Sequence, residues 1–180
     1  MNFQQKLADY VLENRTTSQI PDIAITGMAE GLESDSLIIL AGMNDRDNTF
    51  ELQQYFEQML LELKLELPNK LSAANTLITF HLERMINEPE QSFEIMTTIK
   101  NQVDDSFDWP MENTTKYLGE ELDLHHLYTW YLELQDLEDG SLILYYTDIP
   151  EFEQKRKFEE HLIEEAKNWL NRNKNTHNSP

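Results

Sequence analysis

The chain has 180 residues, 39% of them hydrophobic, and its 34 Asp and Glu outnumber its 14 Lys and Arg to give a net charge of −20. That charge repels polyanions, which argues against DNA, RNA and anionic membranes as ligands. No cysteine, apolar signal region or stretch of roughly 18 apolar residues is present, so disulfides and thiolate metal sites are excluded and we expect a soluble, unprocessed cytoplasmic protein.

Helical periodicity dominates from the start of the chain. Apolar residues from Phe3 to Val11 predict a first short helix. Ser18 is expected to cap a second helix, with Pro21 in its first turn and Gly31 at its end.

Capping and helix-terminating residues bound the next helices. Ser34 is expected to cap a third, short helix that Gly42 ends. A fourth begins at Phe50 and stops before Pro68, because the residue preceding a proline avoids helical geometry. Two further helices are predicted over residues 71–85 and 93–103.

The helical periodicity of apolar residues is lost in the middle of the chain. Residues 104–113 contain four acids and a Trp-Pro pair without periodicity, so we interpret them as a connection between two halves of one domain. A short helix is expected over residues 115–122, followed by a stronger helix that Asp123 caps and Gly140 closes. Residues 141–147 are rich in β-formers and predict an extended segment or a two-stranded fragment.

The last helix gives the strongest pattern in the chain. It opens at Pro150 and stacks apolar residues from Phe158 to Leu170, and a disordered tail is expected over residues 173–180. Seven or eight helices with short connections predict an all-α fold, an orthogonal multi-helix bundle in one domain over residues 1–172. A helical solenoid is less favoured because the sequence has no internal repeat.

Histidines near carboxylates raise the question of a metal site. Three pairs have helical spacing, namely Glu121 with His125, Asp123 with His126, and His161 with Glu165. No Glu-x-x-His motif occurs, as a di-iron bundle would require. His81 lies on the apolar stripe of its helix, which favours a core residue over a ligand. We therefore predict no metal site.

The sequence also lacks the motifs of calcium binding, phosphate binding and serine catalysis. An EF-hand starting at Asp45 would place Phe50 where a glycine must turn the loop. The five glycines are scattered, so no phosphate-binding loop forms, and no Gly-x-Ser-x-Gly turn is present. We predict no catalytic residue and no cofactor, and expect a protein that is not an enzyme.

Two charged features mark possible contact surfaces. Acids near aromatic residues suggest an interface with a basic partner, although a solvated acidic face is the plainer interpretation. Its candidate residues are Asp104, Asp105, Asp108, Trp109, Glu112, Glu120, Glu121 and Asp123. Lys155, Arg156 and Lys157 begin the last helix, and we expect them to pair with acids of the same chain, with a homodimer left open.

One stretch resembles a known group of proteins. The pattern Gly-Leu-x-Ser-x-x-Leu-x-x-Leu-Ala-Gly, here Gly31 to Gly42, is similar to that of an uncharacterised family of bacterial all-helical proteins, a domain of unknown function. The resemblance extends over residues 1–103 and more loosely beyond. It implies a small cytoplasmic helical protein and brings no catalytic residue with it.

Two function classes follow from the sequence. The favoured class is a non-enzymatic, acidic protein-binding module, in its sharpest form an immunity-type inhibitor that covers the nucleic-acid groove of a basic nuclease. The alternative is a metal-dependent hydrolase or other enzyme that uses the cluster from Glu120 to His126.

Overall fold

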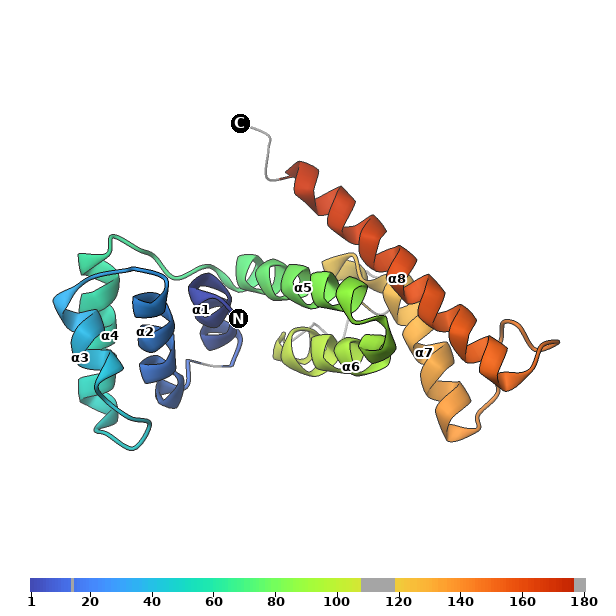
Figure 1. Cartoon of the computed structure of the whole chain (residues 1–180), viewed down its shortest axis with the longest axis horizontal. Coiled ribbons are helices and arrows are strands. Elements are labelled where there is room, and N and C mark those ends of the chain that lie inside the picture. The colour runs from blue at the N-terminus through green and yellow to red at the C-terminus, as the bar shows by residue number, and fades with distance from the viewer. Residues whose placement is uncertain (14, 108–118, 177–180) are drawn as a thin grey trace. The chain divides into compact units, whose positions relative to one another are not determined.

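The computed structural model describes residues 1–13, 15–107 and 119–176, and within these ranges not the side chains of Glu121 and residues 174–176. The described residues form eight α-helices and no strand, which confirms the predicted all-α class (Figure 1). Contacts divide the chain into two compact units, residues 1–77 and 78–180. The boundary between the two units falls inside helix α5, whereas the sequence suggested a junction at residues 104–113. The prediction of a single domain over residues 1–172 stays a prediction.

Unit 1 is built from four helices and the first half of a fifth. They are α1 (Phe3–Leu12), α2 (Ile20–Ala29), α3 (Asp35–Ala41), α4 (Thr49–Glu62) and α5 (Lys70–Asn87), with a 3-10 turn at Thr17–Gln19. The apolar faces of α1 to α4 meet in one core, whose largest buried side chains are Phe3, Leu7, Tyr10, Ile20, Ile23, Leu37, Leu40, Leu52 and Phe56. The helical spacing of these residues in the sequence therefore corresponds to the buried faces.

A side chain caps the N-terminal end of α3 but not that of α2. Ser34 accepts a hydrogen bond from the Leu37 N–H at 3.1 Å and caps α3 as predicted. Ser18 does not cap α2: it lies inside the 3-10 turn, and Gln19 occupies the cap position without a side-chain bond. The turn runs directly into α2, so it supplies the backbone geometry that a capping serine would otherwise provide.

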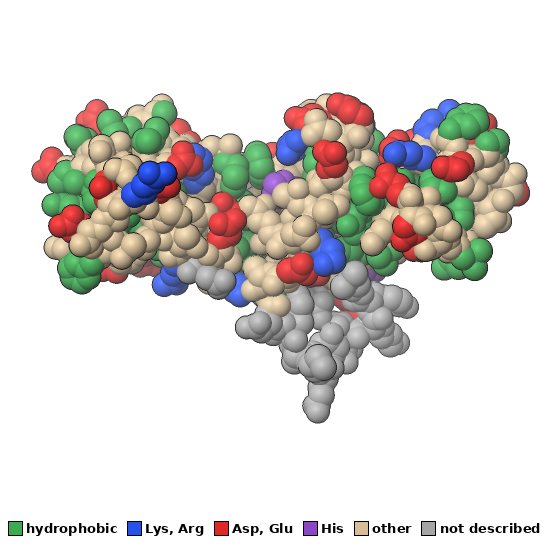
Figure 2. All heavy atoms as spheres, turned by 90° about the horizontal axis from the view of Figure 1, so that it is seen from below, with side chains coloured by type: hydrophobic (Ala, Val, Ile, Leu, Met, Phe, Trp, Pro, Cys, Tyr) green, Lys and Arg blue, Asp and Glu red, His purple; other side chains and the backbone are tan. Residues whose placement is uncertain are grey.

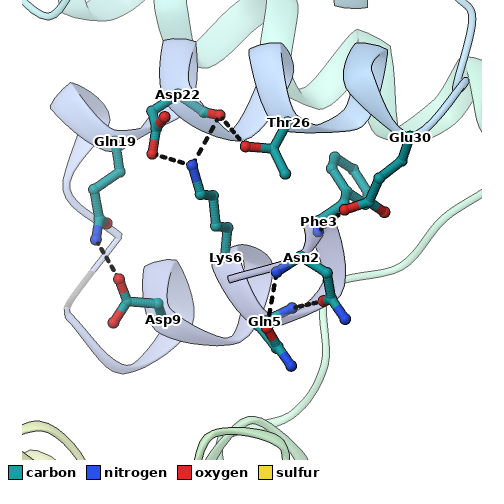
Figure 3. Close-up of polar contacts among 9 residues, drawn as sticks. All are labelled: Asn2, Phe3, Gln5, Lys6, Asp9, Gln19, Asp22, Thr26 and Glu30. Carbon is teal, nitrogen blue, oxygen red and sulfur yellow. Dashed lines mark hydrogen bonds and ion pairs between the residues drawn. The ribbon is translucent and has the colours of Figure 1, made fainter. Parts of the chain in front are cut away.

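Polar contacts join α1 to α2 beside the core (Figure 3). Lys6 pairs with the carboxylate of Asp22, and the Phe3 N–H donates to Glu30 Oε1 at 2.6 Å. Asp22 lies in the first turn of α2 and Glu30 caps its C-terminal end, while both donors lie in the first turns of α1. Because these contacts come from separate turns of each helix, they fix the register of α1 against α2.

Gly27 allows this close approach of the two helices. A Cβ atom there would lie 2.9 Å from the Phe3 ring and 3.3 Å from Leu37 Cδ1. We expect Gly27→Ala to lower the free energy of unfolding by about 1 kcal/mol, because the strain exceeds the helix propensity gained. Chemical denaturation measures this. Gly42→Ala is the control, since no atom lies closer than 3.4 Å to its Cβ position. A loss of stability in Gly42→Ala as large as that in Gly27→Ala, or no loss in Gly27→Ala, would contradict the packing argument.

Glu62 closes the N-terminal end of α3 from the neighbouring helix α4. Its carboxylate accepts from the Ser36 N–H at 3.0 Å and the Ser36 hydroxyl at 2.9 Å. The backbone hydrogen bond, which favours the charged form, holds the pKa of Glu62 below its ordinary value. The stabilisation is therefore complete above that ordinary value, near 4.5, and is lost as the pH falls through the lower folded-state pKa.

This arrangement predicts a pH-dependent effect of Glu62→Gln. The variant should be less stable than the wild type at pH 7, and the difference should shrink as the pH is lowered below about 4.5, where the wild-type carboxyl also becomes neutral. Urea denaturation at a series of pH values measures it. A difference that stays constant down to pH 2 would show that charge plays no part.

Unit 2 contains the second half of α5 and three further helices. They are α6 (Ser92–Gln102), α7 (His125–Asp139) and α8 (Glu151–Thr176), with 3-10 turns at Pro89–Gln91, Asp104–Ser106 and Glu120–Leu122. Helix α7 packs along α8. The buried Trp169 of α8 donates its indole N–H to the Leu122 carbonyl at 3.1 Å and so holds the turn before α7.

Several predicted boundaries of unit 2 need correction. Residues 141–147 form no strand, so the two-stranded alternative is wrong, and the segment bends at residues 144 and 145. Asp123 does not cap α7: it adopts a left-handed conformation with φ 56°, and its carboxylate pairs with Arg172. Of the helix expected over 115–122, only the 3-10 turn lies within the described residues, and α8 continues to Thr176 where a disordered tail was expected to have begun.

The length and apolar character of the helices bear on membrane insertion. Within the part of the chain that the structure describes, no helix has the length and apolar character needed to span a bilayer.

Candidate interaction surface

The acidic surface expected from the sequence is only partly within the described residues. Asp108, Trp109 and Glu112 lie outside them, as does the side chain of Glu121. Glu120 is exposed. Asp105 is 3.1 Å from Lys100, and Asp123 is 2.8 Å from Arg172. Asp105 and Asp123 are thus each paired with a cation of the same chain.

Asp104 lies below the surface. It is 5% exposed and sits in the turn after α6, near the buried Tyr128 of α7. Burial raises the pKa of the Tyr128 hydroxyl, and the negative charge of Asp104 raises it further. Asp104 therefore belongs to the packing between α6 and α7 and cannot contact a partner in this state.

The described residues do not assemble a metal site. Nowhere among them do three or more His, Asp or Glu side chains gather closely enough to hold an ion. The His125 and His126 rings pack on one another at 4.0 Å. His81 is buried, with its Nε2 atom 2.7 Å from Gln102 Oε1, which confirms the expected core position.

The basic run at the start of α8 pairs within the chain, as predicted. Lys155 lies 3.3 Å from Glu138 of α7, and Lys157 lies 3.0 Å from Glu160 of α8. Arg156 is 3.6 Å from the same Glu160. These exposed pairs contribute little stability each, but they leave the charge of this region largely balanced.

The connection between α7 and α8 exposes large apolar side chains. We call residues 136–154 the hairpin tip. Leu142, Leu144 and Phe152 within it are 83%, 74% and 72% exposed, and Tyr145 is 46% exposed. Figure 2 shows hydrophobic and charged side chains together at the right-hand edge of the view, where this connection lies in Figure 1. Several large apolar side chains exposed within one short connection mark a contact surface more often than a solitary exposed leucine does.

The backbone of the hairpin tip is held from inside. Glu133 of α7 is 4% exposed, and its Oε2 atom accepts the N–H groups of Leu144 at 2.9 Å and Tyr145 at 3.3 Å. From α8, the Gln154 amide donates to the Tyr146 carbonyl at 2.9 Å. The apolar side chains therefore point outward from a loop whose backbone is bonded to both helices.

An aromatic cluster supports the same loop. Trp130 stacks on His161 with ring centroids 4.0 Å apart and an angle of 12° between the planes. Tyr146 places its hydroxyl oxygen 2.7 Å from His161 Nε2. Tyr145 packs against Trp130 at 5.2 Å, and Tyr146 against Phe158 at 5.9 Å. This stacking orders the loop and makes it a preformed surface.

The hairpin tip itself is acidic, and the cations Lys155, Arg156 and Lys157 follow it directly in α8. Residues 136–154 contain no Lys, Arg or His and hold six acids, Asp136, Glu138, Asp139, Asp148, Glu151 and Glu153. Glu138 pairs with Lys155, whereas Asp139, Asp148 and Glu151 are exposed. We call the exposed carboxylates of Asp139, Asp148 and Glu151 the acidic rim of the hairpin tip.

Sequence reasoning missed this surface because it considered residues 141–147 only as an extended segment or a two-stranded fragment, and not for the side chains that they expose. The useful signal was present: an apolar run of four residues or more lay between two amphipathic helices whose own apolar faces were already complete. Because the apolar faces of both helices are complete, the side chains of this run have no helix face to pack against. The neighbouring acids also disfavour the burial of these side chains. Comparison with known protein families, curated proteins and solved structures finds no match to this chain.

Proposed function

We propose that this chain is a non-catalytic, cytoplasmic protein-binding module that contacts its partner through the hairpin tip. The observation that carries the proposal is the outward projection of Leu142, Leu144 and Phe152 from a loop whose backbone is bonded to Glu133 and Gln154. Exposing three large apolar side chains on an ordered loop costs solubility, and a partner that covers them recovers the hydrophobic free energy.

The acidity of the chain supports the same class of function. A net charge of −20 attracts basic proteins over a distance and repels nucleic acids that compete for them. An inhibitor that covers the groove of a basic nuclease is the sharpest form of this proposal, and in that form the chain would suppress cleavage when added in equal amounts.

The experiment compares proteins captured from a native cell lysate by three forms of the chain. The tip variant carries Leu142→Ser, Leu144→Ser and Phe152→Ser. The control variant carries Phe50→Ser and Leu61→Ser, which are 74% and 72% exposed in unit 1. A partner should be recovered with the wild type and the control variant and lost with the tip variant. Equal recovery with all three forms, or recovery of nothing above background, would refute the proposed contact surface.

A further inference from the structure

The backbone of the hairpin tip excludes one common mode of peptide binding. Successive N–H groups of a strand point in opposite directions, yet those of Leu144 and Tyr145 both donate to one oxygen of Glu133. The Tyr146 carbonyl is likewise occupied by Gln154. A partner strand therefore cannot pair continuously through residues 144–146, and binding through side chains is favoured here.

The chemistry of the exposed side chains defines what such a partner carries. Leu142, Leu144 and Phe152 offer apolar contact area, and the rim offers the exposed carboxylates of Asp139 and Asp148. A matching surface offers both apolar side chains and Lys or Arg. An α-helix with apolar residues at i, i+3, i+4 and i+7 and cations on its flanks presents this arrangement without using its backbone.

We infer that the segment seated on the hairpin tip is a cationic amphipathic helix of a partner protein. The inference rests on the proposed function and specifies its partner. Paired charges at the rim set orientation and association rate, and the central apolar contacts supply most of the binding free energy. Because the rim is exposed, the affinity falls as the salt concentration rises.

Fluorescence anisotropy with labelled synthetic helices tests the inference. The first peptide has leucines on one face and lysines elsewhere, the second replaces the lysines with glutamates, and the third keeps the lysines but replaces the leucines with glutamines. A proline-rich extended peptide with the same lysine content is the fourth. We expect the first to bind the full-length wild type about tenfold or more tightly than any of the others.

Variants separate a specific surface from general attraction to an acidic chain. The tip variant should lose about tenfold in affinity for the first peptide, and the Phe50 and Leu61 control variant should lose none. A rim variant, Asp139→Asn, Asp148→Asn and Glu151→Gln, should bind more weakly and with a reduced salt dependence. Its matched control removes the same charge from exposed acids of unit 1, Glu33→Gln, Asp45→Asn and Glu66→Gln.

The outcomes distinguish this inference from the proposed function. Equal binding of the four peptides, no binding of any, or equal losses in rim and control variants would overturn the cationic helix. So would a dimer of the wild type, seen by light scattering and abolished in the tip variant, since a second copy would then occupy the tip. If a lysate partner is nevertheless lost with the tip variant, the proposed function stands and only the helix is wrong; if none is lost, the proposed function itself fails.

Discussion

Replacing Glu133 with leucine is expected to lower the free energy of unfolding by about 3 kcal/mol, because two N–H groups then lose a charged acceptor. The side chain is buried on α7, and the amides of Leu144 and Tyr145 depend on it. Chemical denaturation measures the loss. Hydrogen exchange should also become faster at these two amides, and the tip should bind its partner more weakly because its loop is no longer preformed.

Two comparisons isolate the role of the buried carboxylate. Glu133→Gln keeps an acceptor oxygen at nearly the same place, so it should lose clearly less stability than the leucine variant. Glu138→Leu removes an acid of the same helix that forms an exposed ion pair with Lys155, and it should change stability by less than about 0.5 kcal/mol. Unchanged exchange at Leu144 in the Glu133 leucine variant would show that the loop is held by other contacts.

Local signals in the sequence were sufficient for most helices. Ser34 and Gly42 bound α3 because capping and helix termination depend on a few neighbouring residues. Ser18 and Asp123 have the right chemistry for a cap and do not act as one. Asp123 binds Arg172, which is 49 residues away, and no local pattern reports such a contact.

The candidate site was harder to predict for the same reason. Residues 141–147 have the composition of a strand, but Glu133 turns their backbone and thereby leaves Leu142 and Leu144 exposed. Composition describes average preferences, whereas tertiary hydrogen bonds decide a single loop. Asp104 shows the converse case, since an acid that looks like surface in the sequence is buried against α7.

Phe56→Ala should be the most damaging single change in unit 1, with a loss of about 4 kcal/mol. Phe56 is 1% exposed, and its ring packs against that of Tyr10 with centroids 4.9 Å apart. Removing it deletes apolar contacts between α1 and α4 and leaves a cavity that close-packed neighbours cannot fill completely. Because contacts concentrate within each compact unit, the loss of hydrogen-exchange protection should centre on α1 to α4.

Phe50→Ala provides the matched control for this expectation. The two phenylalanines lie on the same helix, but Phe50 is 74% exposed and has little apolar area to lose. Its alanine variant should therefore unfold within about 0.5 kcal/mol of the wild type. Hydrogen exchange of the Phe56 variant then tests the division of the chain, because protection retained along α7 and α8 while α1 to α4 open would mean that unit 2 does not depend on the core of unit 1. Equal loss of protection in both units would instead mean that the chain unfolds as one cooperative body, as the sequence alone had suggested.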